Sequence, residues 1–274
     1  MMQPHEDRVV AELKELTEKL VKLRQFITSS SIFRELPADE QARLKTQVFH
    51  MSMTLPERMK RLAVDERGYP VPWFVAWQDG KPEFRASCGA KFVAAIRQKL
   101  CWVCGERLGV NVCFVAGPMC GINRTSSEPP SHLECARWSA QNCPFLSNPR
   151  MVRREDEQLN NANLRENAAG LALTRNPGVA MLWITRQFEV FDDGSGKYLI
   201  QMGEPESVEW WAHGREATRA EVEASVESGL PNLEAIARQQ RGGSEALAKC
   251  VARFQRFLPL ADRQLTSSSQ EATL

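Results

Sequence analysis

The sequence predicts an α+β protein built from an N-terminal helical hairpin, a central treble-clef-like zinc module and a C-terminal unit of a small sheet with helices. Apolar residues at coiled-coil spacing predict the hairpin, a cluster of cysteines predicts the zinc module, and strand-like runs between capped helices predict the rest. We place these units at 1–63, 70–154 and 155–260, the last packed on the zinc module, and expect a disordered tail at 261–274.

The composition is typical of a soluble globular protein, with 274 residues of which 43% are hydrophobic and 25% are charged. No stretch approaches the roughly 18 consecutive apolar residues of a membrane helix, and no apolar region of the signal-peptide kind follows the polar N-terminus. We therefore expect a cytoplasmic protein that makes no contact with a membrane. Seven of the eight cysteines lie between Cys88 and Cys143, and in a cytoplasmic chain this clustering favours a metal site over disulfides.

Two apolar stripes at alternating spacings of four and three residues predict the N-terminal hairpin. The stripes consist of Val9, Leu13, Leu16, Leu20, Leu23 and Ile27, and of Leu44, Val48, Met51 and Leu55. Two helices bury little apolar surface by themselves. The segment 7–62 is therefore expected to pack on the rest of the chain, on a second copy in self-association, or on a protein partner.

A β-hairpin and a helix are predicted between the helical hairpin and the cysteines. The strand-like runs Trp73–Trp77 and Glu83–Arg85 flank an Asp-Gly pair, which favours a type I′ turn. Apolar residues in Gly89–Leu100 recur at helical spacing. This helix delivers the chain directly to Cys101.

The cysteine cluster begins with Cys101 and Cys104, which are separated by two residues and followed by a glycine. This spacing lets both sulfurs face one metal ion. Downstream, Gly109–Ala116 predicts a strand, Gly117–Met119 a turn and Cys120–Arg124 the returning strand of a hairpin. A knuckle followed by a hairpin provides the first two parts of a treble clef.

The third part is a helix with the second pair of ligands. Glu128-Pro-Pro-Ser131 supplies a stop and a serine N-cap, so His132 and Cys135 lie on one face of the first turn. Four such donors form the closed tetrahedral set of a structural zinc site. The fourth ligand is open between His132 and Cys143 at the helix end. The remaining thiols expected to be ordinary buried residues are Cys88, Cys113 and Cys250.

Charge is unevenly distributed along the chain. Residues 85–154 carry ten Lys/Arg against three Asp/Glu, a net charge of +7, whereas 155–274 carry twelve against eighteen, a net charge of −6. A basic zinc module is suited to a phosphate-bearing partner, and the alternative is that the two halves attract one another within the fold. The candidate contacts to an anion or nucleic acid are Arg107, Arg124, Arg137, Arg153 and Arg154.

The C-terminal unit holds a second candidate binding feature. Trp210, Trp211 and Arg215 combine aromatic rings with a guanidinium, and such a cluster can stack a base or a nucleotide. The alternative is that the two tryptophans pack the sheet under the helices. The elements predicted around them are a buried strand at Val179–Thr185, an exposed turn at Asp192–Lys197, a helix from the Thr218–Glu221 capping box to Gly229, another from Leu230 to Gly242, and a last one at Ser244–Leu258.

Two resemblances to known families extend this picture. Asp7-Arg-Val-Val through Arg61-Leu62, about a fifth of the chain, resembles small helical-hairpin proteins of tailed phages, which implies a phage or prophage origin and a bacterial host cell. Residues 70–240 resemble an uncharacterised phage and bacterial zinc-binding family that has no established activity. The motifs are Cys101-Trp-Val-Cys-Gly-Glu-Arg-Leu-Gly109, Ala116-Gly-Pro-Met-Cys120, Asn123-Arg124, Glu128-Pro-Pro-Ser-His-Leu-Glu-Cys135, Cys143-Pro-Phe-Leu146, Val208-Glu-Trp-Trp211, Gly214-Arg215, Ala217-Thr218 and Gly229-Leu-Pro231.

The motifs favour a binding protein over an enzyme. Zinc deaminases use a His-x-Glu and a Cys-x-x-Cys, but here His132–Glu134 follows Cys101–Cys104, and Cys135 fills the position that an activated water would need. A ββα zinc nuclease needs a histidine in the hairpin, and Val110–Arg124 contains none. We expect a non-enzymatic phage protein whose basic surface recognises nucleic acid, a nucleotide or an acidic partner. The alternative is a phage protein that counters host defence or modulates a host enzyme through protein contacts.

Overall fold

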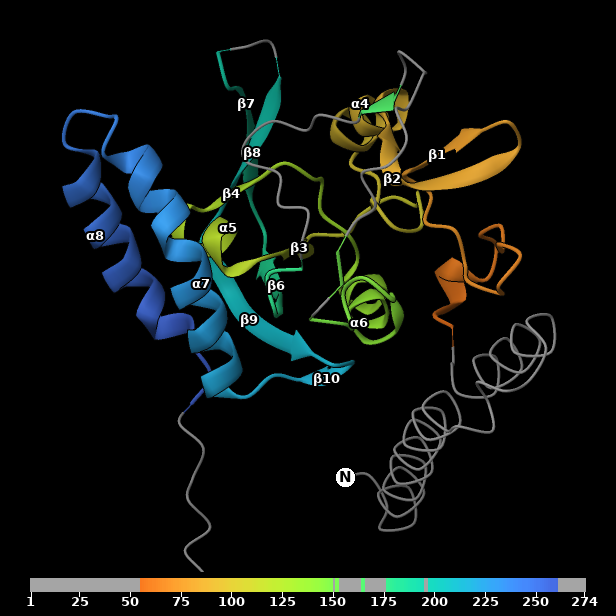
Figure 1. The fold of residues 1–274 in the computed structure, drawn as a ribbon. Coiled ribbons are helices and arrows are strands. Elements are labelled where there is room, and N and C mark those ends of the chain that lie inside the picture. The colour runs from red at the N-terminus through yellow and green to blue at the C-terminus, as the bar shows by residue number, and fades with distance from the viewer. Residues whose placement is uncertain (1–54, 150, 153–163, 166–175, 195–196, 261–274) are drawn as a thin grey trace, which may run out of the picture.

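The structure is a computed structural model that describes residues 55–149, 151–152, 164–165, 176–194 and 197–260 (Figure 1). Most of the predicted hairpin at 1–63 and all of the predicted tail at 261–274 lie outside these ranges. The described chain combines helices with antiparallel sheets, as the sequence predicts. None of its helices is both long and apolar enough to span a membrane.

A four-stranded antiparallel sheet of order β10-β9-β6-β3 lies at the centre. Every residue of the predicted strand β6 is buried. Because side chains alternate across a strand, Met181 and Trp183 enter the core on one face, while Leu182 and Ile184 enter a second core on the other. The strands are β3 (Val112–Ala116), β6 (Ala180–Thr185), β9 (Pro205–Ala212) and β10 (Arg215–Glu216).

Helices cover both faces of this sheet (Figure 1). On one face, helix α6 (Leu133–Asn142) packs through Ala136 and Ala140. On the other face lie α5 (Pro118–Asn123), α7 (Arg219–Ala237), α8 (Gly243–Phe254) and the short 3-10 helix η2 (Gln255–Phe257). The sheet therefore separates α6 from the α7–α8 pair.

Two smaller sheets complete the described fold. One has the order β1-β2-β5 and the other β4-β8-β7. Asp79 and Gly80, between β1 and β2, have φ values of 50° and 75°, as a type I′ turn requires, and this confirms the predicted β-hairpin. The remaining elements are η1 (Glu57–Met59), β1 (Val75–Gln78), β2 (Lys81–Cys88), α4 (Gly89–Gln98), β4 (Thr125–Ser126), β5 (Leu164–Arg165), β7 (Phe188–Asp192) and β8 (Tyr198–Met202).

The predicted return strand Cys120–Arg124 is wrong, because this segment forms helix α5. Pro118 occupies the first turn, where its fixed φ suits a helix. Gly121 lets α5 approach the core closely, since a Cβ there would lie 2.5 Å from Phe254 and 2.7 Å from Met181. Strand β3 pairs instead with the distant β6, so the hairpin that a treble clef needs between knuckle and helix is not formed by this segment.

The predicted helix break at Gly229–Pro231 is also wrong, because α7 runs through it. Gly229 is buried against Met119 of α5, where a Cβ would meet the side chain at 2.9 Å, so this glycine permits close packing rather than ending the helix. Pro231 is exposed. The capping box at the start of α7 is confirmed, since the Thr218 side chain accepts from the Glu221 amide and the Glu221 carboxylate accepts from the Thr218 amide.

Candidate metal centre

The first pair of candidate ligands lies in a tight turn after α4. The amide of Cys101 donates to the carbonyl of Glu106 at 2.7 Å, and the amide of Gly105 donates to the carbonyl of Cys101 at 2.8 Å. Gly105 has a φ of 74°, and a Cβ there would lie 2.6 Å from the Trp73 ring, so both backbone and packing require glycine. The predicted knuckle is thus formed with both sulfurs on its inner side.

The two residues between the knuckle cysteines fix the turn to different parts of the core. Trp102 stacks on Phe74 with ring centroids 5.0 Å apart and meets Phe92 edge to face at 6.0 Å. Val103 instead joins the apolar cluster that contains the cysteines. The knuckle is therefore held by aromatic packing as well as by its backbone bonds.

The second pair of candidate ligands lies at the start of α6. The N-cap is His132 rather than the predicted Ser131, and it makes no side-chain cap bond. Ser131 instead exchanges two backbone hydrogen bonds with Cys113 of β3, at 2.9 and 2.7 Å. This bridge to the sheet positions His132 and Cys135 opposite the knuckle.

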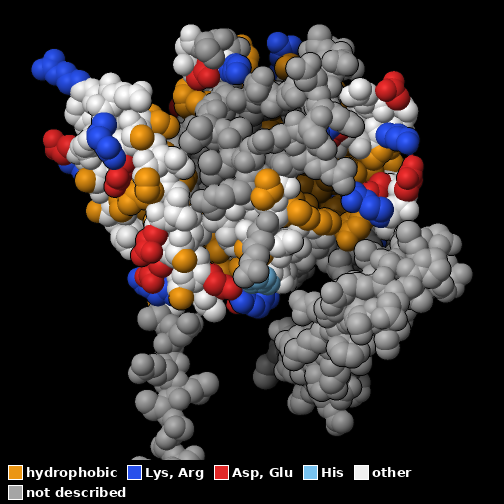
Figure 2. All heavy atoms as spheres, in the orientation of Figure 1, with side chains coloured by type: hydrophobic (Ala, Val, Ile, Leu, Met, Phe, Trp, Pro, Cys, Tyr) orange, Lys and Arg blue, Asp and Glu red, His pale blue; other side chains and the backbone are white. Residues whose placement is uncertain are grey.

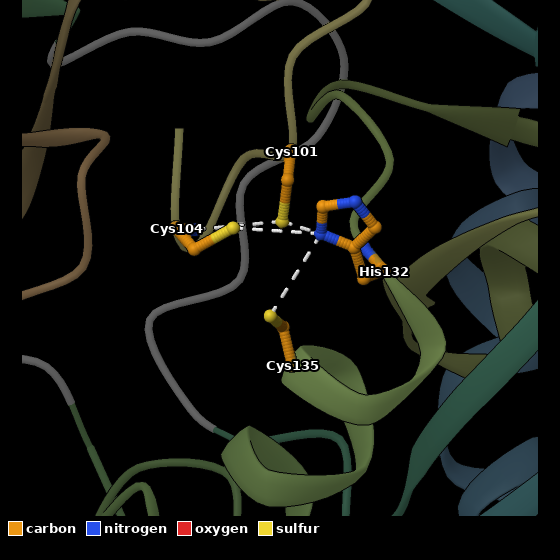
Figure 3. Close-up of side chains that lie close together, drawn as sticks. All are labelled: Cys101, Cys104, His132 and Cys135. Carbon is orange, nitrogen blue, oxygen red and sulfur yellow. Dashed lines mark hydrogen bonds between the residues drawn. The ribbon is translucent and has the colours of Figure 1, made fainter. Parts of the chain in front are cut away.

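Figure 3 shows the four side chains converging on one point from the knuckle and from the start of α6. Their donor atoms all lie within 4.8 Å of one another. The Nδ1 atom of His132 is 3.4 Å from the Cys104 sulfur and 4.0 Å from the Cys135 sulfur. The cluster of Cys101, Cys104, His132 and Cys135, called the metal centre below, can hold a metal ion.

Neighbouring groups orient the ligands of the metal centre. The Nε2–H of His132 donates to the carbonyl of Arg107 at 3.0 Å, which turns Nδ1 towards the sulfurs. The amides of Cys104 and His132 each lie 3.4 Å from the Cys101 sulfur, as donors to a thiolate would. The three thiols are buried, so the ligand set is closed to solvent on the sulfur side.

The side chains of the metal centre shift one another's pKa values. Burial disfavours the Cys101 thiolate, but hydrogen bonds from Cys104, Cys135 and His132 outweigh it and lower the Cys101 pKa well below its usual value. Hydrogen bonds with Cys101 and Cys104, opposed by burial, raise the pKa of His132 to about 10. A metal ion needs the thiolates and the neutral imidazole, so its binding displaces protons from this cluster.

The alternative ligand Cys143 lies outside the cluster. It is the C-cap of α6, eight positions beyond Cys135, and this separation is about 12 Å along a helix axis. Burial raises the pKa of both Cys113 and Cys120, the latter to about 11, so these two thiols stay protonated. Cys113 is buried, Cys120 is partly buried, and neither belongs to the cluster of candidate ligands.

Two of the five arginines predicted to contact an anion form ion pairs with acidic residues of the C-terminal half. Arg124 binds Glu204 at 2.6 Å, and Arg137 binds Glu209 through its Nε at 2.9 Å. On the face drawn in Figure 2, described Lys and Arg side chains lie beside Asp and Glu rather than in one basic patch. Arg107 is exposed, whereas Arg153 and Arg154 lie outside the described residues.

The residues predicted to stack a base lie in the core or in an ion pair. Trp210 and Trp211 are only 5% and 8% exposed, and the Trp210 Nε1–H donates to the carbonyl of Phe257 at 2.8 Å. Arg215 binds the carboxylate of Glu221 at 2.7 Å. The two indole faces are therefore covered in this conformation, as the packing alternative expects.

Three residues beside the metal centre carry no sequence signal that links them to it. Arg58, Met59 and Arg61, from the turn around η1, lie against the knuckle and α6. The only signal in the sequence is an apolar residue, Met59, flanked by basic residues. This pattern is common in exposed helices. Nothing in the spacing connects this turn to the metal-centre cysteines, which begin forty residues after Arg61.

A family model described as Sequestin matches residues 3–61. Of this match, the structure describes only 55–61, the turn that lies against the metal centre. No curated protein and no solved structure matches the chain. The fold and the site define a mixed α and β protein with a Cys/His cluster suited to a metal ion.

Proposed function

We propose that this chain is a non-enzymatic binding protein whose metal centre holds a structural zinc ion. The observation that carries the proposal is the closed set of three sulfurs and one nitrogen within 4.8 Å. Tetrahedral zinc with its usual bond lengths places neighbouring donors about 3.4–3.8 Å apart, which fits the 3.4 Å between Cys104 and His132. Soft thiolates with one imidazole favour zinc over the harder divalent cations.

The position of Glu134 supports a structural rather than a catalytic ion. In a deaminase this carboxylate would face a metal-bound water, but here it binds the guanidinium of Arg58 at 2.7 Å and half of its side chain is exposed. The four protein ligands also fill a tetrahedral shell and leave no coordination position for water. We therefore assign the ion to stabilising the fold.

We propose further that the partner is a phosphate-bearing polymer, bound at the exposed bases Arg97, Lys99 and Arg107. Among the described residues none of the three forms an ion pair, in contrast to Arg124 and Arg137. Lys99 and Arg107 are adjacent in space because the amide of Leu108 donates to the carbonyl of Lys99 at 2.8 Å. Arg97 and Lys99 also complement the C-terminal dipole of α4, whereas Arg107 has no such helix role.

A salt titration of binding tests this partner. Single-stranded DNA, duplex DNA, RNA and an acidic polypeptide are each titrated with the full chain at several salt concentrations. Lys99→Glu with Arg107→Glu should weaken binding to nucleic acid and flatten its salt dependence by about two charges. Arg241→Glu with Arg253→Glu, the same total charge change at exposed residues of the α7–α8 region, is the matched control. Binding to the polypeptide alone, or to nothing, would contradict the proposed partner.

A further inference from the structure

The turn around η1 bridges the two halves of the metal centre. The guanidinium of Arg58 binds Glu134 of α6 through Nε at 2.7 Å and Glu106 of the knuckle through Nη1 at 2.9 Å. Arg61 binds Glu106 at 3.2 Å and donates to the carbonyl of Cys104, also at 3.2 Å. Residues 55–62, called the strap below, are therefore joined to both ligand-bearing elements.

Met59 is the apolar anchor of the strap. Its side chain is 1% exposed and packs in one cluster with Cys101, Cys104 and Cys135. The neighbouring Arg58 and Lys60 are exposed, whereas Leu55 and Leu62 of the strap pack against the same cluster and are partly buried. The cluster that surrounds Met59 therefore includes three of the metal ligands, together with Val103 and Trp138.

We propose that the metal centre is a docking surface for the strap, and that metal binding decides whether the strap is held. This inference rests on the proposed zinc site. Glu106 lies two residues beyond Cys104, and Glu134 immediately precedes Cys135, so the ion sets the distance between the two carboxylates that Arg58 spans. The same ion keeps the sulfurs together around Met59.

Loss of the metal loosens both parts of this surface. Without the ion, the knuckle and the start of α6 are joined only by the intervening chain and by hydrogen bonds such as that from the Trp102 amide to the Pro130 carbonyl at 3.0 Å, so the two carboxylates and the cluster around Met59 are held less firmly. The ion pairs of Arg58 and Arg61 are largely exposed, and exposed pairs contribute little each, so they do not hold the strap alone. By linkage, a docked strap also raises the metal affinity of the centre.

The docking surface fits a short segment with an Arg-Met-x-Arg pattern. In this chain the pattern is Arg58 to Arg61. The strap is also the described end of the segment that matches Sequestin. The metal centre therefore contacts the described end of that matched segment. Metal loading controls how firmly this contact is made.

Limited trypsin digestion of the full chain tests the proposal. Cleavage after Lys60 and Arg61 is measured by mass spectrometry for metal-loaded protein and for protein stripped by a chelator, with cleavage after Arg241 as internal reference. Stripping should accelerate cleavage in the strap by about tenfold or more and leave cleavage after Arg241 unchanged. Equal strap cleavage in both states would overturn the proposal, as would a parallel rise after Arg241, which indicates global unfolding.

Two variants separate the strap from the metal site. Arg58→Glu should free the strap while the chain keeps its metal, so cleavage after Lys60 and Arg61 rises in the metal-loaded protein. Arg253→Glu, the same charge reversal at an exposed residue of α8, is the matched control and should leave strap protection unchanged. Wild-type protein that binds no metal contradicts the zinc site itself, whereas metal retained with unprotected Lys60 and Arg61 contradicts only the docking surface.

Discussion

The main-chain carbonyl of Arg107 accepts the Nε2 hydrogen of His132 at 3.0 Å, while the Arg107 side chain is exposed. One residue thus orients a metal ligand with its backbone and offers a cation to solvent with its side chain. Arg107→Ala should therefore keep the metal affinity of the wild-type chain within about twofold, because the backbone contact remains. Chelator competition measures this affinity, and a large loss would show that the side chain supports the ligand.

Cys135→Ser should reduce the metal content to below about a tenth of the wild-type value and destabilise the fold, because metal binding contributes folding free energy. Elemental analysis and thermal unfolding measure the two effects. Cys143→Ser is the matched control and should retain the full metal content, since Cys143 lies outside the cluster. Loss of metal in the Cys143 variant would show that Cys143, rather than His132, is the fourth ligand.

Metal affinity should fall as the pH is lowered. Hydrogen bonds with Cys101 and Cys104 raise the pKa of His132 to about 10. The protonated ring stabilises the metal-free fold fully below its unfolded pKa near 6.5, and this contribution is lost as the pH rises through about 10. Because a metal must displace this proton, affinity measured by chelator competition from pH 9 to pH 6 should fall by about tenfold or more per unit. Constant affinity over that range would contradict proton displacement.

Glu221→Gln should destabilise the protein by about 1 kcal/mol at neutral pH, because the carboxylate caps α7 and is partly solvent-screened. Hydrogen bonding to Arg215 lowers the pKa of Glu221 to about 2. A lowered pKa stabilises the fold above the unfolded pKa near 4.5, and the stabilisation is lost as the pH falls through about 2. Urea unfolding at pH 7 should separate variant from wild type, and the difference should shrink towards pH 2. Glu227 is exposed on the same helix, so Glu227→Gln should change neither the stability at pH 7 nor its dependence on pH.

Gly121→Ala should destabilise the protein by about 1–3 kcal/mol, since its Cβ would overlap Phe254 and Met181. Denaturant unfolding measures the loss. Gly109→Ala is the control, because a Cβ there meets nothing within 4 Å. Equal stability of the two variants would contradict the close packing of α5.

The sequence predicted correctly those features that are determined by neighbouring residues in the chain. The Asp-Gly turn, the Thr218 capping box and the cysteine spacing each depend on a few neighbouring residues, and the structure forms all three. The segment after β3 was misassigned because its partner is chosen by tertiary contacts. Val112–Ala116 pairs with a strand more than sixty residues later, so no turn signal nearby could reveal it.

The binding surface was predicted less well than the metal centre because charge counts ignore pairing. The net +7 of 85–154 includes Arg124 and Arg137, which bind Glu204 and Glu209 from the acidic half. This is the internal attraction that the sequence left as an alternative. The strap was missed for a related reason, because Arg58 meets Glu134 only after the chain has folded.

The pairing of β3 with β6 also affects how the protein is made. Cys101 to Cys135 leave the ribosome before Ala180, the first residue of β6, and at ordinary rates of synthesis this interval is roughly 2–9 s. During that time all three cysteines of the metal centre have been synthesised. Strand β6, which pairs with β3, has not. A nascent chain that binds the proposed zinc ion can therefore do so before its central sheet is complete, and the ion would then organise the surface on which the later strands assemble.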